Sequence, residues 1–156
     1  MTETERILDQ LKRAYKGGAW HGPSVRETLA GLSAEIAAAR PISAAHSIWE
    51  VVLHIAAWQA AVGRRLGGDR AQLPTEEDWP VVIETSEAAW SEAKKALDQS
   101  HDSLVAAVSG LDETRLDEPI LTEMPSIYVT LHGVIQHDLY HAGQIAILKK
   151  ALGIAS

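Results

Sequence analysis

Apolar residues recur every three or four positions over most of the chain, which is the spacing of one face of an α-helix. Strand-like alternation is nearly absent, and the apolar run at 80–83 is too short and isolated to seed a sheet. We therefore expect an all-α fold, a four-helix up-down bundle with short extra helical turns. The principal helices are predicted at 4–15, 47–66, 86–108 and 129–152, and the short turns at 23–29, 33–39 and 112–116.

Start and stop signals set the bounds of these helices. The clearest start is a capping box, in which Ser47 and Glu50 each satisfy a backbone N–H of the other. Glycine pairs at 17–18 and 67–68 end the first two long helices. Residues 69–84 are polar and contain two prolines, which predicts a loop with at most one helical turn. Such a connection is long for a minimal bundle.

Composition narrows the class of protein. A chain of 156 residues suits one domain, residues 1–156. The absence of cysteine excludes disulfides, a thiolate metal site and a cysteine nucleophile. Lys and Arg number 14 against 21 Asp and Glu, a formal charge of −7, which argues against nucleic acid and anionic membranes as partners. The polar N-terminus and the lack of a long apolar run are typical of a cytoplasmic protein, and we expect a small-molecule substrate.

Three of the seven histidines form the strongest chemical pattern in the chain. His137 and His141 are four residues apart, so their imidazoles share one helix face and can reach one metal ion. An isolated pair of this kind is more often two independent surface residues, but this pair borders the apolar arc of the last helix, as does Gln144. His54 borders the apolar arc of the 47–66 helix; alone, it would be a core histidine bonded to a carbonyl. Together the three predict a divalent metal site with an open position for water or substrate.

Simpler roles are predicted for the other polar candidates and the tryptophans. His46 is expected to be exposed near the start of its helix, with a place at the mouth of the pocket as the alternative, and His132 is expected to be structural. His101 is expected to be a hydrogen-bonded core residue. Asp138 points about 100° away from His137 and is not expected to bind the ion. The tryptophans on helix faces are assigned to the core, although one beside His54 could also wall the pocket: Trp49, Trp58 and Trp90.

Two motifs carry a resemblance to a known family. Leu53-His54-Ile-Ala-Ala-Trp58, after Ser47-Ile-Trp49, and His137-Asp-Leu-Tyr-His141-Ala-Gly-Gln-Ile145 resemble the DinB-like superfamily of small four-helix proteins, which is related to YfiT-type metal-dependent hydrolases. In that family a histidine of the second helix and a His-x-x-x-His pair of the last helix bind a divalent metal, and His54, His137 and His141 match those positions. The family commonly has an arginine where Ala142 stands here, so an arginine-dependent substrate contact is in doubt.

The resemblance also implies a reaction. Characterised relatives are metal-dependent transferases that use low-molecular-weight thiols such as bacillithiol and mycothiol, so a thiol S-transferase acting on an electrophilic small molecule is expected, as is a homodimer. Zinc or nickel is expected because imidazole suits both metals. Two alternatives stay open: a hydrolase that uses metal-bound water, and a non-enzymatic, stress-related helical binding module with a structural metal. No general base can be assigned from the sequence.

Overall fold

The computed structural model describes residues 1–70 and 72–155, and its regular structure there is helical, with one isolated β-bridge between Pro119 and Ser126. This confirms the predicted all-α class. The long helices are α1 (Glu3–Lys16), α4 (Ile48–Leu66), α6 (Glu87–Ser109) and α7 (Ile127–Ala151), each within two residues of its predicted bounds. The short ones are α2 (Val25–Leu29), α3 (Ala34–Ala38), α5 (Thr75–Asp78) and the 3₁₀-helix η1 (Glu113–Arg115). Among the described residues, no helix is both long and apolar enough to cross a membrane.

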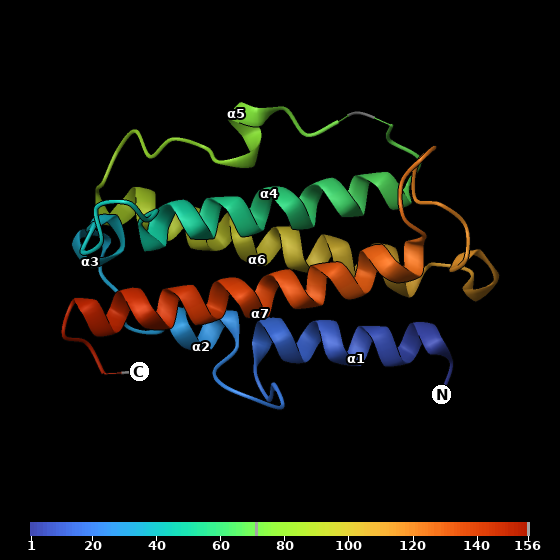
Figure 1. Cartoon of the computed structure of the whole chain (residues 1–156), viewed down its shortest axis with the longest axis horizontal. Coiled ribbons are helices and arrows are strands. Elements are labelled where there is room, and N and C mark those ends of the chain that lie inside the picture. Colours follow the sequence, from blue (N-terminus) through green and yellow to red (C-terminus); the bar gives the residue numbers. More distant parts are fainter. Residues whose placement is uncertain (71, 156) are drawn as a thin grey trace.

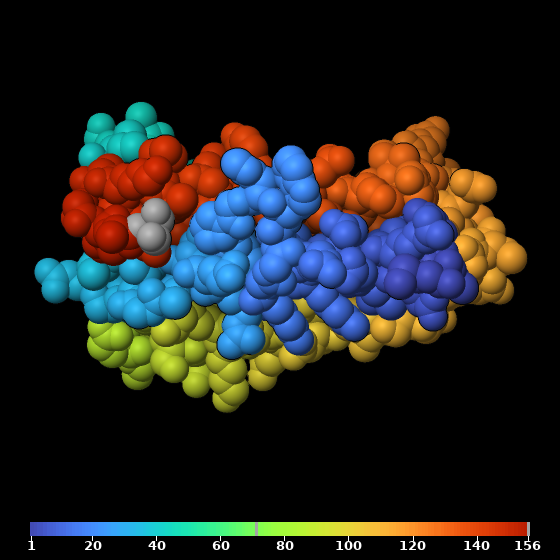
Figure 2. All heavy atoms as spheres, turned by 90° about the horizontal axis from the view of Figure 1, so that it is seen from below, coloured from blue at the N-terminus to red at the C-terminus, as the bar shows by residue number. Residues whose placement is uncertain are grey.

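The four long helices lie along one axis and pack as a bundle (Figure 1). Helix α4 packs against α6 and α7, and α1 packs against the same two helices. Seen from below, α1 and α2 fill the groove between α6 and α7 (Figure 2). The bundle therefore has α1 and α4 at opposite corners, and the groove between α4 and α7 lies away from α1.

The connectivity differs from the predicted up-down order. Helices α4 and α6 run parallel: Trp49 and Trp90, near the two helix starts, have ring centroids 5.1 Å apart, and Gly63 near the end of α4 lies against the backbone of Leu104. The connection at 67–86 must therefore return along the whole bundle, and it carries α5 over α4 (Figure 1). A chain of this length can reach about 60 Å when extended, twice the roughly 28 Å length of α4, so a crossover is sterically easy.

Side-chain caps fix where the helices start. The predicted capping box at α4 is confirmed: Glu50 N–H donates to Ser47 Oγ at 3.2 Å, and Ser47 N–H donates to Glu50 Oε2 at 2.7 Å. Such caps contribute about 1 kcal/mol each. Because the cap defines the first turn of α4, it also sets the position of His54, about two turns further along the helix.

A layer of buried polar side chains crosses the bundle between two apolar clusters. One cluster includes Ile55 and Leu97, the other Val62 and Leu104, and the chain between these positions places Gln59 and His101 in the layer. Asp138 joins the layer from α7, where Gln59 Nε2 donates to its Oδ2 at 2.9 Å. The polar layer thus lies at the level of the bundle at which the predicted metal-binding histidines meet.

Candidate metal centre

The structure brings His54, His137 and His141 together in the groove between α4 and α7. The Nε2 atom of His137 lies 3.0 Å from Nε2 of His54 and 3.1 Å from Nε2 of His141, and one ligand atom from each residue lies within 4.8 Å of the others. Two nitrogens bound to one ion at about 2.0–2.1 Å can be up to about 4 Å apart. The three-histidine group could therefore hold a divalent metal ion.

Hydrogen bonds to the far side of two rings fix their tautomers. His54 Nδ1 lies 2.6 Å from the backbone carbonyl oxygen of Asp78, and His141 Nδ1 lies 2.7 Å from Gln144 Oε1. Both oxygens accept, so each Nδ1 carries the hydrogen and each Nε2 presents a lone pair. Metal-binding histidines typically have this arrangement, with the second ring nitrogen bonded to a carbonyl or a similar acceptor.

The two lone pairs make the group a good fit for a cation. Both point at Nε2 of His137, and a single proton on that atom could bond well to only one of them. The Nδ1 atom of His137 is buried and has no hydrogen-bond partner among the described residues. A metal ion between the rings would use all three lone pairs, which the protein's own hydrogen bonds cannot do.

Burial keeps the pair on α7 in the neutral form that binds metals. Desolvation lowers the pKa of His137 to about 4, with smaller contributions from the neighbouring imidazoles of His141 and His54. Desolvation also lowers the pKa of His141, against the opposing hydrogen bond to Gln144. Both rings are therefore unprotonated at neutral pH, so few protons compete with a metal ion.

The crossover connection closes one side of the centre. Trp79 stacks on His54 at a centroid distance of 3.8 Å and an interplanar angle of 6°, and it also stacks on His46 at 3.7 Å. Asp78 Oδ1 accepts a hydrogen bond from Trp58 Nε1 at 2.6 Å. Asp78 and Trp79 were not predicted from the sequence, where the available signal was a large aromatic residue after the acidic turn in an otherwise polar loop.

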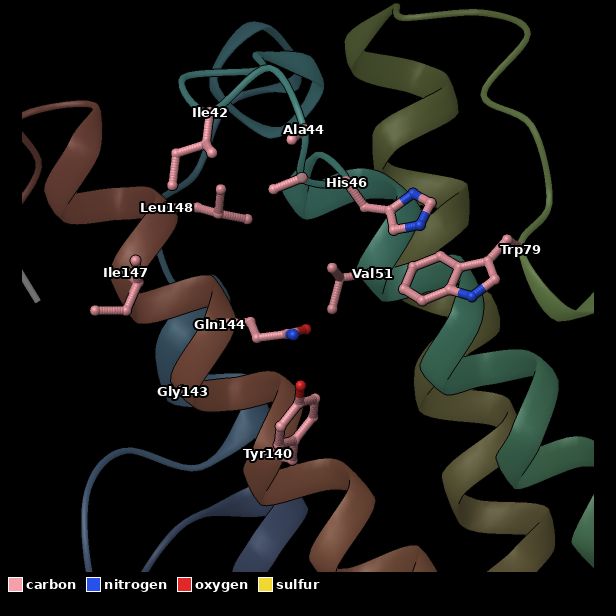
Figure 3. A pocket seen from close by; sticks show the side chains of 11 residues that line it. Ile42, Ala44, His46, Val51, Trp79, Tyr140, Gly143, Gln144, Ile147 and Leu148 are labelled. Carbon is pink, nitrogen blue, oxygen red and sulfur yellow. The ribbon is translucent and has the colours of Figure 1, made fainter.

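Two cavities lie along the groove, one on each side of the histidines. The first, about 530 Å³, is mostly apolar, and the polar tips of Tyr140 and Gln144 point into it (Figure 3). The second, about 640 Å³, is lined by His54 and His137 together with Arg65 and a wall of apolar residues. Because Gln144 also bonds His141, the candidate metal centre lies between the two cavities.

The remaining histidines have separate surroundings. His46 is exposed and lines the first cavity, in agreement with its predicted place at the pocket mouth. His132 Nδ1 bonds the carbonyl oxygen of Tyr128 one turn earlier, at 3.0 Å, as a structural residue would. The predicted hydrogen bond of His101 is wrong: its ring is fully buried and stacks on Tyr15 at 4.0 Å, and neither nitrogen has a partner among the described residues. Helix periodicity predicts burial, but it carries no information about which atoms meet a buried ring.

The core assignments and the exclusion of Asp138 can also be compared with the structure. Trp49 and Trp90 are buried, as predicted. Trp58 is only partly buried and lines the second cavity, so its alternative role as a pocket wall is the one observed. Asp138 is fully buried and bonds Gln59 rather than joining the three histidines. Burial raises the pKa of its carboxyl group to about 7.

Residues 19–145 match a family model described as the DinB superfamily. The matched range contains all three histidines of the candidate centre. No curated protein and no solved structure matches the chain.

Proposed function

The chain belongs to the DinB superfamily, and on this premise we propose that it is a metal-dependent thiol S-transferase. His54, His137 and His141 bind a divalent ion, zinc or nickel, and a low-molecular-weight thiol is transferred to an electrophilic small molecule beside it. The observation that carries this proposal is the convergence of three Nε2 atoms. In His54 and His141, a hydrogen bond at Nδ1 leaves the lone pair of Nε2 free to bind the ion.

Two cavities beside one centre favour a reaction of two molecules. A divalent ion bound by the histidines would lower the pKa of a coordinated thiol, so that the thiolate forms at neutral pH. The chain has no cysteine, so the thiol has to be a separate molecule. The thiol proton passes to solvent, a sulfur–carbon bond forms, and the electrophile either accepts the electron pair by addition or loses a leaving group with it.

The chain's own residues position the reactants and exclude water. Gln144 and the carbonyl group of Asp78 keep His141 and His54 in the binding tautomer. Trp79 covers one ring of the centre and limits access of water from that side. The Tyr140 hydroxyl and the Gln144 amide provide hydrogen bonds for the polar groups of a molecule in the first cavity (Figure 3).

Hydrolysis is the second candidate, favoured by the position of Asp78. Its carboxylate lines the second cavity, and its Oδ1 lies 3.2 Å from His54 Nδ1. A carboxylate at this place could act as a general base toward a water molecule in the cavity. In this reaction the protein would consume an ester or amide without a thiol.

One experiment separates these functions. Untagged protein loaded with zinc or nickel is incubated with monochlorobimane, alone or with cysteine, glutathione, bacillithiol or mycothiol, and thioether products are measured by mass spectrometry. The transferase proposal predicts a conjugate with at least one thiol, lost in His137→Ala and retained in His132→Ala, which alters the same helix outside the centre. A panel of esters and amides is tested in parallel without thiol. Turnover of these substrates without any thiol conjugate would favour hydrolysis, and unfolding on chelation without turnover would favour a structural metal.

A further inference from the structure

We propose that the second cavity selects apolar small molecules that carry a carboxylate, and that Arg65 is the residue that binds this carboxylate. The inference rests on the proposed function, since it assigns the chemical class of one reactant at the same site. Arg65 belongs to the last turn of α4 and lines the cavity together with His54 and His137.

Arg65 is a buried cation, and no carboxylate of the described residues pairs with it. Its side chain is 7% exposed, its Nε has no hydrogen-bond partner, and it forms no ion pair with a carboxylate among the described residues. The neighbouring Arg64 is exposed, and its Nε lies 3.4 Å from Asp69 Oδ2. The Trp58 ring lies against the guanidinium group, but a charge that is buried without a carboxylate partner is costly. The dipole of α4 does not explain why Arg65 is buried, because an exposed cation in the last turn, such as Arg64, already interacts favourably with the C-terminal end of the helix.

The position of Arg65 suits one end of a bound molecule. Its guanidinium carbon lies 5.7 Å from the ring of Trp58, and that ring lies 6.4 Å from the ring of His137. The two distances together place the guanidinium group no more than about 12 Å from the His137 ring. A single small molecule can therefore touch Arg65 with one end while its reactive group lies at the histidines.

The rest of the cavity determines the nature of that molecule. The wall of the same cavity includes Val62, Ile120, Met124 and Val134, which favour an apolar body. The planar guanidinium group matches a carboxylate with two parallel N–H donors. The other charged residue of the lining, Asp78, is bonded through Oδ1 to Trp58 Nε1 and lies 3.2 Å from His54 Nδ1. Arg65 can therefore balance one carboxylate charge, whereas a phosphate dianion would need further donors.

The test compares a matched acid and amide, octanoate and octanamide, by titration calorimetry with metal-free and zinc-loaded protein. We expect wild-type protein to bind the acid about ten- to a hundredfold more tightly than the amide, as a charge-assisted hydrogen bond implies. Arg65→Gln is expected to bind both equally, and Arg64→Gln, the matched control on the same turn, is expected to behave as wild type. Equal affinities in wild type, or a preference that survives in Arg65→Gln, would overturn the proposal.

Metal-free protein separates this proposal from the proposed function. The preference for the acid should persist without zinc, because Arg65 is not a ligand; a preference seen only with zinc would place the carboxylate on the ion and would overturn the assignment. Failure of the protein to bind zinc would count against the proposed function alone. Tighter binding of octyl phosphate than of octanoate would overturn the choice of carboxylate. If circular dichroism shows that Arg65→Gln does not fold, Arg65→Lys is used in its place. Lysine lacks the paired N–H donors of arginine, so the preference for the acid should be severalfold smaller than in wild type, and an unchanged preference would contradict the paired-donor contact.

Discussion

Replacement of Gln144 by leucine tests whether the hydrogen bond behind His141 prepares the ring for metal binding. In the structure, His141 Nδ1 donates to Gln144 Oε1 at 2.7 Å, which holds the lone pair of Nε2 toward the other two histidines. The leucine removes the hydrogen-bond acceptor but is similar in size to glutamine, so the cavity wall stays filled. The His141 ring can then rotate and exchange tautomers in the metal-free protein. Metal binding has to restrict the ring to one rotamer and one tautomer again, and this cost lowers the metal affinity.

The size of the effect follows from the single hydrogen bond that is removed. A neutral hydrogen bond contributes about 0.5–1.5 kcal/mol net, a factor of roughly 2 to 12 in affinity. Loss of a hydrogen-bond partner behind a metal-binding histidine typically lowers metal affinity by about 10- to 100-fold. The two ranges meet near tenfold, or about 1.4 kcal/mol, which is our expected loss for Gln144→Leu.

Competition with a chromophoric chelator gives the zinc affinity of untagged protein at pH 7.5. Gln136→Leu is the matched control, because it makes the same change on the same helix at an exposed position. A loss of less than twofold in Gln144→Leu, or an equal loss in Gln136→Leu, would refute the reasoning that this hydrogen bond orients the ring.

Two further predictions concern the buried polar layer, both measured by urea unfolding of metal-free protein. Burial lowers the pKa of His101 to about 4, below the usual 6.5. Between these two pH values the unfolded chain binds more protons than the folded chain. The free energy of unfolding therefore decreases as the pH falls from 6.5 to 4, by up to about 3 kcal/mol. His101→Phe keeps a ring stacked on Tyr15 but cannot be protonated, so it should raise the free energy of unfolding more at pH 4.5 than at pH 7.5. An equal increase at both pH values would contradict this prediction. Burial raises the pKa of Asp138 to about 7, above the usual 3.8, so stability is lost as pH rises between these values, by roughly 4 kcal/mol. Asp138→Asn can still accept the hydrogen bond from Gln59 but carries no charge. It should therefore stabilise the folded protein at pH 8 but not at pH 4, and a variant that is less stable than wild type at pH 8 would contradict this prediction.

Local signals in the sequence predicted the helices and the edges on which the histidines lie. Ser47 and Glu50 mark the start of α4 through contacts made within one turn, so no knowledge of the rest of the fold is needed. The apolar arcs of α4 and α7 then place His54 and the pair on α7 at the border of the core. The same arcs do not say which helices are neighbours or how they are directed, and the parallel packing of α4 and α6 was accordingly missed.

The features missed at the site depend on contacts between distant segments. Asp78 and Trp79 lie in a connection without periodicity, and they reach His54 only because the parallel arrangement of α4 and α6 sends that connection back along the bundle. The apolar arc likewise predicted that His101 is buried but not that it stacks on Tyr15 without a hydrogen bond. Arg65 resembles an ordinary basic residue at a helix end until its burial beside the second cavity is known.

The zinc content of untagged protein after dialysis, determined by elemental mass spectrometry, tests the central claim most directly. The account predicts one ion per chain in wild type and in His132→Ala, and loss of that ion in His54→Ala, His137→Ala and His141→Ala with helicity retained in circular dichroism. Wild-type protein without bound metal, or the three variants with an undiminished metal content, would contradict the account.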